Sequence, residues 1–336
     1  MGEATIRDVA RRAEVSVASV SRALNGLDNV RAETRERIVA AAAELGYVPH
    51  AGARSLSLAR AHAIGVVLPD LHGEFFSECV RGMDREASRR GYLLLLSNMH
   101  DDSDQSAVAL RAMRGRVDGL LVMAPHIEGE ALERTLPGAI PAVLINCPGE
   151  FATRPSIRFD NAAGAEAMVD HLAANGYRHI VHVAGPETNV DAIERAQGYR
   201  AAMGRLGLRA RVVAGNFSEE AGEEAARTIL ESREPCDAIF AANDMMAIGA
   251  LHTLRSLGKR VPEDIAVAGF DDVPLARYLA LSTVRVRIAE MGARAVARLI
   301  ALLDGSDPGD ACEVHTPDLV ARATTAARIN TIPSSS

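Results

Sequence analysis

Polar and aromatic side chains recur where apolar segments of this chain end, and their chemistry is that of a binding site. Asn189, Asp191 and Arg195 follow the segment HIVHVAG, and Asn243 follows AIFAA. Open parallel α/β sheets bind ligands beyond the carboxyl ends of their strands. Carboxylates and amides bonding hydroxyl groups, with rings against C–H faces, are typical of a site for a polyhydroxylated small molecule. The residues that follow expected strands in this way are Asp70, Phe75, Phe76, Asp160, Asn161, Asn189, Asp191, Arg195, Phe217, Asn243, Asp244, Asp271 and Asp272.

Helix capping is the alternative role for the Asn and Asp residues of this set. Both types are common at the start of a helix, where their side chains accept a hydrogen bond from the backbone. Capping explains neither Arg195 nor the phenylalanines, although Phe217 by itself could belong to a core. The pattern predicts a cleft lined by carboxylates, amides, one Arg and several Phe rings.

Motifs of the common catalytic folds are missing from the sequence. It contains no G-x-G-x-x-G, Walker A loop, G-x-S-x-G elbow or H-E-x-x-H. His171, His179 and His182 are close in sequence, but they fall on different expected elements. We therefore expect a binding protein with no catalytic residues, no metal site and no cofactor.

Two α/β lobes are expected to position the cleft. Strands are expected at 63–69, 92–97, 119–123, 142–145, 156–159, 179–184, 211–214, 237–241 and 265–270, with helices at 74–90, 103–114, 130–136, 161–174, 190–206, 218–231 and 244–257. This alternation predicts parallel sheets with helices on both faces, and it holds more units than one sheet should carry. Segments at 282–286, 288–303, 313–316 and 319–323 are expected to cross back between the lobes. The N-lobe would then comprise about 62–161 and 288–318, and the C-lobe about 162–287 and 319–330.

A small helical head precedes the lobes. The stretch TIRDVARRAEVSVASVSRALN at 5–25 predicts two short helices joined by a tight turn, and Glu33–Leu45 predicts a third. In the second helix Val20 and Leu24 point one way, and small residues with Arg22 lie on the other face. A short exposed helix of this kind suits a DNA major groove, although a generic helical hairpin would share the pattern.

Composition limits the class of protein. The chain has 336 residues, of which 48% are hydrophobic, so it is globular and long enough for several domains. The net charge of −7 alone argues against nucleic acid, but residues 1–60 hold nine Arg against seven acidic residues. The four cysteines form no C-x-x-C pair, which indicates reduced thiols. With neither a signal-peptide pattern nor an apolar run of about 18 residues, we expect a cytoplasmic protein.

Several motifs in order resemble one family, the LacI/GalR bacterial transcription regulators. They are the stretch at 5–25, VRAETRERIVAAAAELGYVPH, ARSL, FFSECVRGM, AANDMMAIGAL, VPEDIAVAGFDDVPLARY and STVRVRIAEMG, and the likeness covers about residues 4–328. The resemblance implies an all-α helix-turn-helix head at 1–48 and a hinge helix at 49–61. It also implies a periplasmic-binding-protein-like core of two doubly wound parallel-sheet lobes at 62–330, for effector binding and dimerisation. The tail at 331–336 is expected to be disordered.

The resemblance also implies how such a protein binds double-stranded operator DNA. A homodimer would place one head on each half of a pseudo-palindromic operator. Val17, Ala18 and Arg22 would face base edges, and the hinge would put Leu56 into the minor groove. The other residues expected at the DNA are Thr5, Ser16, Ser21, Asn25, His50, Ala53 and Arg54. Arg31 departs from the family pattern, which usually has Ser or a similar cap there.

For the core, the resemblance implies a repressor controlled by a small molecule in the cleft between the lobes. The matching positions are Phe75, Phe76, Asp160, Asn189, Asp191, Arg195, Phe217, Asn243 and Asp271. Purine-binding relatives have a basic residue and a hydroxyl where this chain has Asn189 and Asp191, so a sugar or sugar derivative is favoured. The regulated genes would then serve carbohydrate uptake or catabolism. A purine or nucleoside effector and a sugar-binding transport component remain the alternatives.

Overall fold

The computed structural model describes residues 4–25, 30–48, 60–71, 73–99, 108, 110–138, 140–149, 151 and 154–327. The expected hinge residues His50, Ala53, Arg54 and Leu56 and the expected disordered tail at 331–336 lie outside the described residues. No helix among the described residues is both long enough and apolar enough to cross a membrane.

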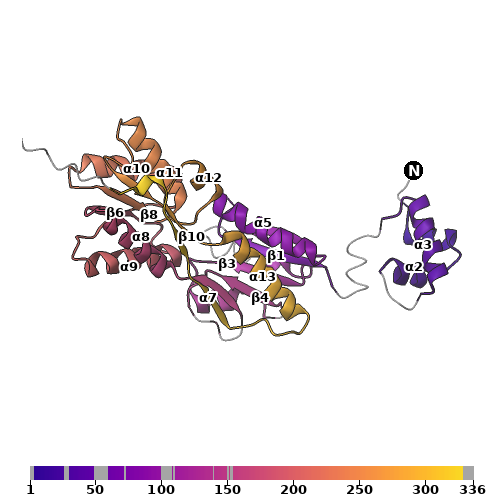
Figure 1. Cartoon of the computed structure of the whole chain (residues 1–336). Coiled ribbons are helices and arrows are strands. Elements are labelled where there is room, and N and C mark those ends of the chain that lie inside the picture. The colour runs from indigo at the N-terminus through magenta and orange to yellow at the C-terminus, as the bar shows by residue number, and fades with distance from the viewer. Residues whose placement is uncertain are drawn as a thin grey trace, which may run out of the picture.

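Three helices form the head: α1 (Ile6–Arg12), α2 (Val17–Leu24) and α3 (Ala32–Glu44) (Figure 1). Val9, Val20 and Ile38 are fully buried, one from each helix, and they make a small core that is separate from those of the lobes. Ser16 begins α2, since its hydroxyl oxygen accepts a hydrogen bond from the backbone N–H of Ser19 at 3.1 Å. Arg31 begins α3 without a side-chain cap.

The N-lobe is built on a six-stranded sheet in the order β11-β5-β4-β3-β1-β2, with every neighbouring pair parallel. Its strands are β1 (Ala63–Leu68), β2 (Leu93–Asn98), β3 (Gly119–Met123), β4 (Ala142–Ile145), β5 (Ser156–Phe159) and β11 (Cys312–His315). Its described helices are α5 (Glu74–Arg89), α7 (Gly129–Thr135) and α13 (Ile288–Leu303). The expected helix at 103–114 lies partly outside the described residues.

Two of these helices pack closely because glycines face the contact. A Cβ on Gly82 of α5 would lie 2.0 Å from the carbonyl oxygen of Ala289, and one on Gly292 of α13 would lie 2.4 Å from that of Cys79. The absence of side chains at these two positions lets α5 and α13 lie side by side (Figure 1). Because α13 comes from the far end of the chain, this contact ties the crossover to the start of the lobe.

The C-lobe is built on a four-stranded parallel sheet in the order β7-β6-β8-β9. Its strands are β6 (Ile180–Val183), β7 (Arg211–Val213), β8 (Ala238–Ala241) and β9 (Ala266–Ala268). Its helices are α8 (Asn161–Ala174), α9 (Val190–Arg205), α10 (Glu219–Glu231), α11 (Asp244–Ser256) and α12 (Pro274–Tyr278). The fold class expected from the sequence, a helix-turn-helix head followed by a two-lobed parallel α/β core, is confirmed.

A two-stranded antiparallel sheet lies where the chain crosses between the lobes. It pairs β10 (Thr283–Arg285) with β12 (Asp318–Val320). The sequence predicted one strand at 319–323, whereas the chain there forms β12 and then a short 3-10 helix at Ala323–Thr325. It also gave no sign of α12, whose five residues are too few for a helical period to show.

Candidate functional site

A cavity of about 470 Å³, counted as space free of protein atoms and including its open mouth, lies between the two lobes. Eight of the nine positions singled out by the resemblance line it. From the N-lobe come Pro69, Phe75, Phe76, Met123 and Pro125, and from the C-lobe Asn189, Asp191, Arg195, Phe217, Asn243 and Asp271. The carboxyl ends of strands from both sheets thus converge on one site, as open α/β sheets require.

Asp160 departs from the expectation, because it does not line the cavity. It is the N-cap of α8, and its Oδ1 accepts a hydrogen bond from the backbone N–H of Ala163 at 3.0 Å. The next residue, Asn161, is 1% exposed, and its side chain bonds to the lining residues Arg195 and Asp191. Helix capping therefore accounts for Asp160. Its neighbour supports the polar wall of the cavity, which is formed by Asn189, Asp191, Arg195, Asn243 and Asp271.

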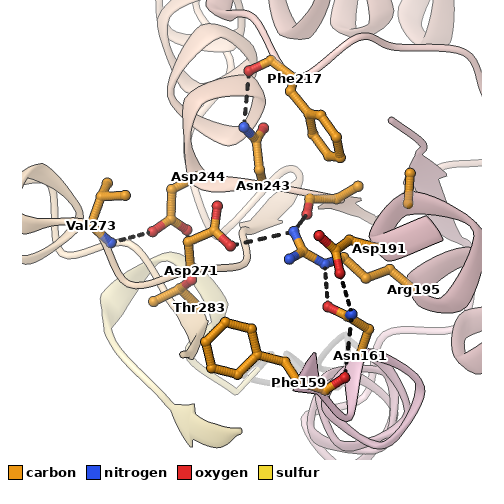
Figure 2. A network of polar contacts seen from close by, with 12 residues as sticks. Phe159, Asn161, Asp191, Arg195, Phe217, Asn243, Asp244, Asp271, Val273 and Thr283 are labelled. Atoms are coloured by element: carbon orange, nitrogen blue, oxygen red, sulfur yellow. Dashed lines mark hydrogen bonds and ion pairs between the residues drawn. The ribbon is translucent and has the colours of Figure 1, made fainter. Parts of the chain in front are cut away.

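Arg195 is the centre of that wall (Figure 2). Its Nε donates to Oδ1 of Asn161 at 2.9 Å, and one terminal nitrogen donates to the carbonyl of Ala242 at 2.6 Å. The same nitrogen lies 3.3 Å from the carboxylate of Asp271. The guanidinium carbon sits 3.9 Å from the centre of the Phe270 ring, a cation–π contact. These contacts hold the planar cation in one orientation beside the cavity.

Two carboxylates flank this cation. Asn161 Nδ2 donates to Asp191 Oδ1 at 2.8 Å, and Asn146 Nδ2 donates to Asp191 Oδ2 at 3.2 Å. Burial raises the pKa of Asp191 above its ordinary value, and it raises the pKa of Asp271 to about 7. In both cases Arg195 opposes the shift. Oδ1 of Asp271, the oxygen that faces Arg195 at 3.3 Å, is buried and accepts no well-formed hydrogen bond from the part of the chain that the structure describes.

Asn189 and Asn243 cap helices and line the cavity at once, so the two roles weighed from the sequence are not exclusive. Asn189 Oδ1 accepts from the backbone N–H of Ala192 at 3.2 Å, and Asn243 Oδ1 accepts from that of Met246 at 3.0 Å. Asn243 Nδ2 donates to the carbonyl of Phe217 at 2.9 Å (Figure 2). Asn189 Oδ1 keeps one lone pair beside the capping bond, so Asn189 can offer a ligand its amide donor and one further acceptor site.

Aromatic rings form the rest of the lining. Phe75 and Phe76 meet edge to face, with centroids 5.3 Å apart and planes at 86°. Phe217 has a φ of 74°, and its ring lies where a Cβ on Gly185 would be only 2.4 Å away. Only glycine at 185 leaves space for that ring. The described N-lobe lining is entirely apolar, and the polar lining residues belong to the C-lobe.

Direct hydrogen bonds join the lobes beside the cavity. Val190 N donates to the carbonyl of Pro125 at 2.9 Å, and Leu275 N donates to Oε2 of Glu74 at 3.1 Å. The Asn146–Asp191 bond is a third such contact. Asn146 was missed from the sequence, although it directly follows β4 and the strand-end rule would have selected it.

The head presents α2 to solvent. Val17 is 42% exposed, and Ser16, Ala18 and Arg22 are also exposed, as is Thr5 ahead of α1. Ser21 and Asn25 are half-buried, whereas Val20 and Ala23 face the core. The residues expected to face DNA therefore occupy the accessible side of a helix whose other side is packed. Over the whole described part of the chain, no three His, Cys, Asp or Glu side chains gather as metal ligands would.

Comparison with known proteins extends these observations over the whole chain. Residues 5–50 match the model for bacterial regulatory proteins of the lacI family, and residues 169–325 match a periplasmic binding protein-like domain. The chain is 33% identical to the HTH-type transcriptional repressor CytR of Escherichia coli (strain K12), over 96% of this chain and 97% of that protein. It is 32% identical to catabolite control protein A of Priestia megaterium, over 93% and 96%.

Solved structures of regulators are also similar to this chain over most of its length. The lac repressor dimer bound to operator and the anti-inducer ONPF has a TM-score of 0.87 at 29% identity, covering 97% of this chain and 100% of that one. The complex of the transcriptional regulator CelR with cellobiose has a TM-score of 0.70 at 30% identity, covering 96% and 99%. The helical head, the two-lobed core and near full-length similarity to repressors together show that the chain belongs to the lacI family of bacterial regulatory proteins, as a DNA-binding transcriptional regulator with an effector-binding core.

Proposed function

We propose that this regulator represses genes for carbohydrate uptake or catabolism, and that a sugar or sugar derivative in the cavity sets its operator affinity. The observation that carries the proposal is the division of the cavity into an apolar N-lobe side and a polar C-lobe side. A sugar ring has the same division, with C–H faces that suit Phe75 and Phe76 and hydroxyls that suit Asp191, Asn189 and Asp271. Among relatives, one is named a ribose operon repressor, and CelR was solved with cellobiose.

A homodimer in the cytoplasm is part of this proposal. β2 is an edge strand of the N-lobe sheet, and Leu93, Leu95 and Leu96 on it are 72%, 38% and 45% exposed. An edge strand with large apolar side chains in water favours association with another surface. A two-fold axis there would make each copy present the same patch and would carry two heads toward one operator.

In the proposed DNA complex, α2 lies in the major groove. Val17 and Ala18 would contact thymine methyl groups, and Arg22 would contribute one guanine contact. Thr5, Ser16, Ser21 and Asn25 would bind phosphates. His50, Ala53, Arg54 and Leu56 would form the hinge contacts in the minor groove, with Leu56 wedged into a base step.

Effector control follows from linkage between the two sites. A sugar touching both lobes stabilises the lobe arrangement it fits best, and the dimer holds its heads differently in each arrangement. The contacts Asn146–Asp191 and Glu74–Leu275 bridge the lobes, so they would differ between arrangements.

In vitro selection followed by titration tests the proposal. Purified full-length protein is mixed with a random double-stranded DNA pool, and the recovered sequence is expected to be a near-palindrome. Sugars and nucleosides are then screened for a change in affinity for that DNA. A response to sugars supports the proposal, whereas a response confined to nucleosides would assign the effector to the other class.

A further inference from the structure

The charges that line the effector cavity do not balance. Asp191, Asp271 and Arg195 are the charged lining residues within the part of the chain that the structure describes. With both acids ionised, two negative charges face one positive charge. Glu194, which acts electrostatically on Asp191, forms a salt bridge with Arg158, so this pair adds no net charge. The described lining therefore carries a net charge of −1 with both acids ionised and is neutral when one of them is protonated.

Arg195, the cation among the described lining residues, is already engaged. Arg195 is 3% exposed, lies 3.3 Å from Asp271, and donates to Asn161 and to the carbonyl of Ala242. Its charge is thus balanced inside the wall. A phosphate or carboxylate group entering the cavity would face Asp191 and Asp271, and the described lining offers no unpaired cation to offset them. In a site withdrawn from water, such repulsion is weakly screened.

The free hydrogen-bonding capacity of the wall also favours donors on the ligand. Oδ1 of Asp271 is buried and lies 3.3 Å from its ion-pair partner Arg195, but it accepts no well-formed hydrogen bond from described residues. Buried polar atoms are normally paired, so a ligand O–H or N–H is the natural partner for this oxygen. A hydroxyl can supply that proton, whereas a phosphate dianion at neutral pH offers only acceptors.

We propose that the effector bears no negative charge, and that Asp191 and Asp271 reject phosphorylated or carboxylated forms of the same molecule. This inference rests on the proposed sugar site and narrows it to free, non-acidic sugars. A regulator with this specificity would respond to a sugar before a kinase or an oxidase has converted that sugar to a phosphate or an acid.

Matched pairs of compounds test the inference on the full-length protein. Isothermal titration compares D-ribose with D-ribose 5-phosphate, D-glucose with D-glucose 6-phosphate and with D-glucuronate, and adenosine with its 5′-phosphate. In at least one pair the neutral member is expected to bind, and its anionic partner to bind about 100-fold more weakly or worse. The wild-type ratio decides the proposal by itself.

Two amide substitutions test whether the charge of Asp191 causes the difference in affinity between the neutral and anionic members of a pair. Asp191→Asn removes one negative charge and is expected to reduce the ratio to about 10-fold or less. Asp160→Asn is the matched control, because Asp160 lies outside the lining and Asn can keep the cap of α8. It is expected to leave both affinities unchanged.

The outcomes separate this inference from the proposed function. A sugar phosphate or glucuronate that binds as tightly as its neutral partner overturns the inference and leaves the sugar assignment standing. Binding of adenosine alone, without its phosphate, supports the charge rule and overturns the sugar assignment. No binding by any compound of the panel contradicts both.

Discussion

The guanidinium group of Arg195 lies 3.3 Å from the carboxylate of Asp271, although 75 residues separate them in the chain. Both residues are buried, at 3% and 4% exposure. Arg195 comes from the helix after β6, and Asp271 follows β9, on the other side of β8. The pair therefore fixes the polar wall of the cavity across three strands of the C-lobe sheet.

Removing the buried cation should destabilise the protein strongly. Arg195→Gln leaves Asp271 and Asp191 without their counter-charge, and breaking a buried pair costs about 3–5 kcal/mol of unfolding free energy. The matched control is Arg205→Gln on the same helix, whose partner Asp170 is exposed. That variant should lose about 1 kcal/mol or less. Urea unfolding of both variants measures the difference, and equal losses would contradict the role assigned to Arg195.

The ionisation of Asp271 should make the free energy of unfolding depend on pH. The folded pKa of this group is raised to about 7 from an ordinary 3.8, so between these values the folded state binds more protons than the unfolded state. Its contribution is therefore largest at low pH and is lost as pH rises through 7. Asp271→Asn removes the effect, so its unfolding free energy should gain on that of wild type by up to about 1.4 kcal/mol per pH unit in this range.

The ionisation of His182 should change the free energy of unfolding with pH in the opposite direction. Burial lowers its pKa to about 3, so its contribution to stability rises with pH up to its ordinary 6.5. Because wild type and Asp271→Asn share His182, the difference between their unfolding curves isolates Asp271. Parallel curves for the two proteins would show that Asp271 does not titrate in this range.

The contact of α5 with α13 should tolerate no side chain at its glycines. Gly82→Ala places a methyl group against the backbone of Ala289, and overpacking of this kind typically costs about 1–3 kcal/mol. Gly138→Ala is the control, since nothing lies within 4 Å of the added Cβ. Thermal unfolding should show a lower midpoint for Gly82→Ala alone. A midpoint equal to wild type would mean that the two helices can separate freely.

The exposed face of α2 should set base preference. Val17→Asn replaces an apolar contact with an amide that pairs with adenine, a change of about 1–3 kcal/mol in discrimination at one base position. Val39→Asn is the control, because Val39 is 51% exposed on α3, away from the expected reading face. In vitro selection should return an altered half-site for Val17→Asn and the wild-type half-site for Val39→Asn. The same half-site from both would remove Val17 from the base contacts.

The site was largely predictable because parallel strands carry their loops to one edge. Strand-end position placed Phe75, Asn189 and Asn243 together before any contact was known, and the resemblance narrowed the wider set. The rule could not decide between Asp160 and Asn161, since adjacent residues at a helix start point in different directions. One of them caps α8, and the other bonds Arg195.

The contacts between individual side chains could not be predicted from the sequence. Nothing in the chain indicates that Arg195 faces Asp271, or that the Asn146 side chain reaches Asp191 across the lobes, because both depend on how separate elements pack. Short elements were also missed. α12 and the 3-10 helix at Ala323–Thr325 are fixed by tertiary contacts and turn chemistry, not by a hydrophobic period.

The most direct test of effector control measures operator affinity with and without the bound sugar. Fluorescence anisotropy follows the selected DNA with wild type and with Asp271→Asn. The neutral sugar should change the operator affinity of wild type about 5- to 150-fold. Asp271→Asn should bind the operator as wild type does without sugar and should not respond to it. A full sugar response in Asp271→Asn, or an operator affinity of wild type that no cavity ligand alters, would contradict the proposed control.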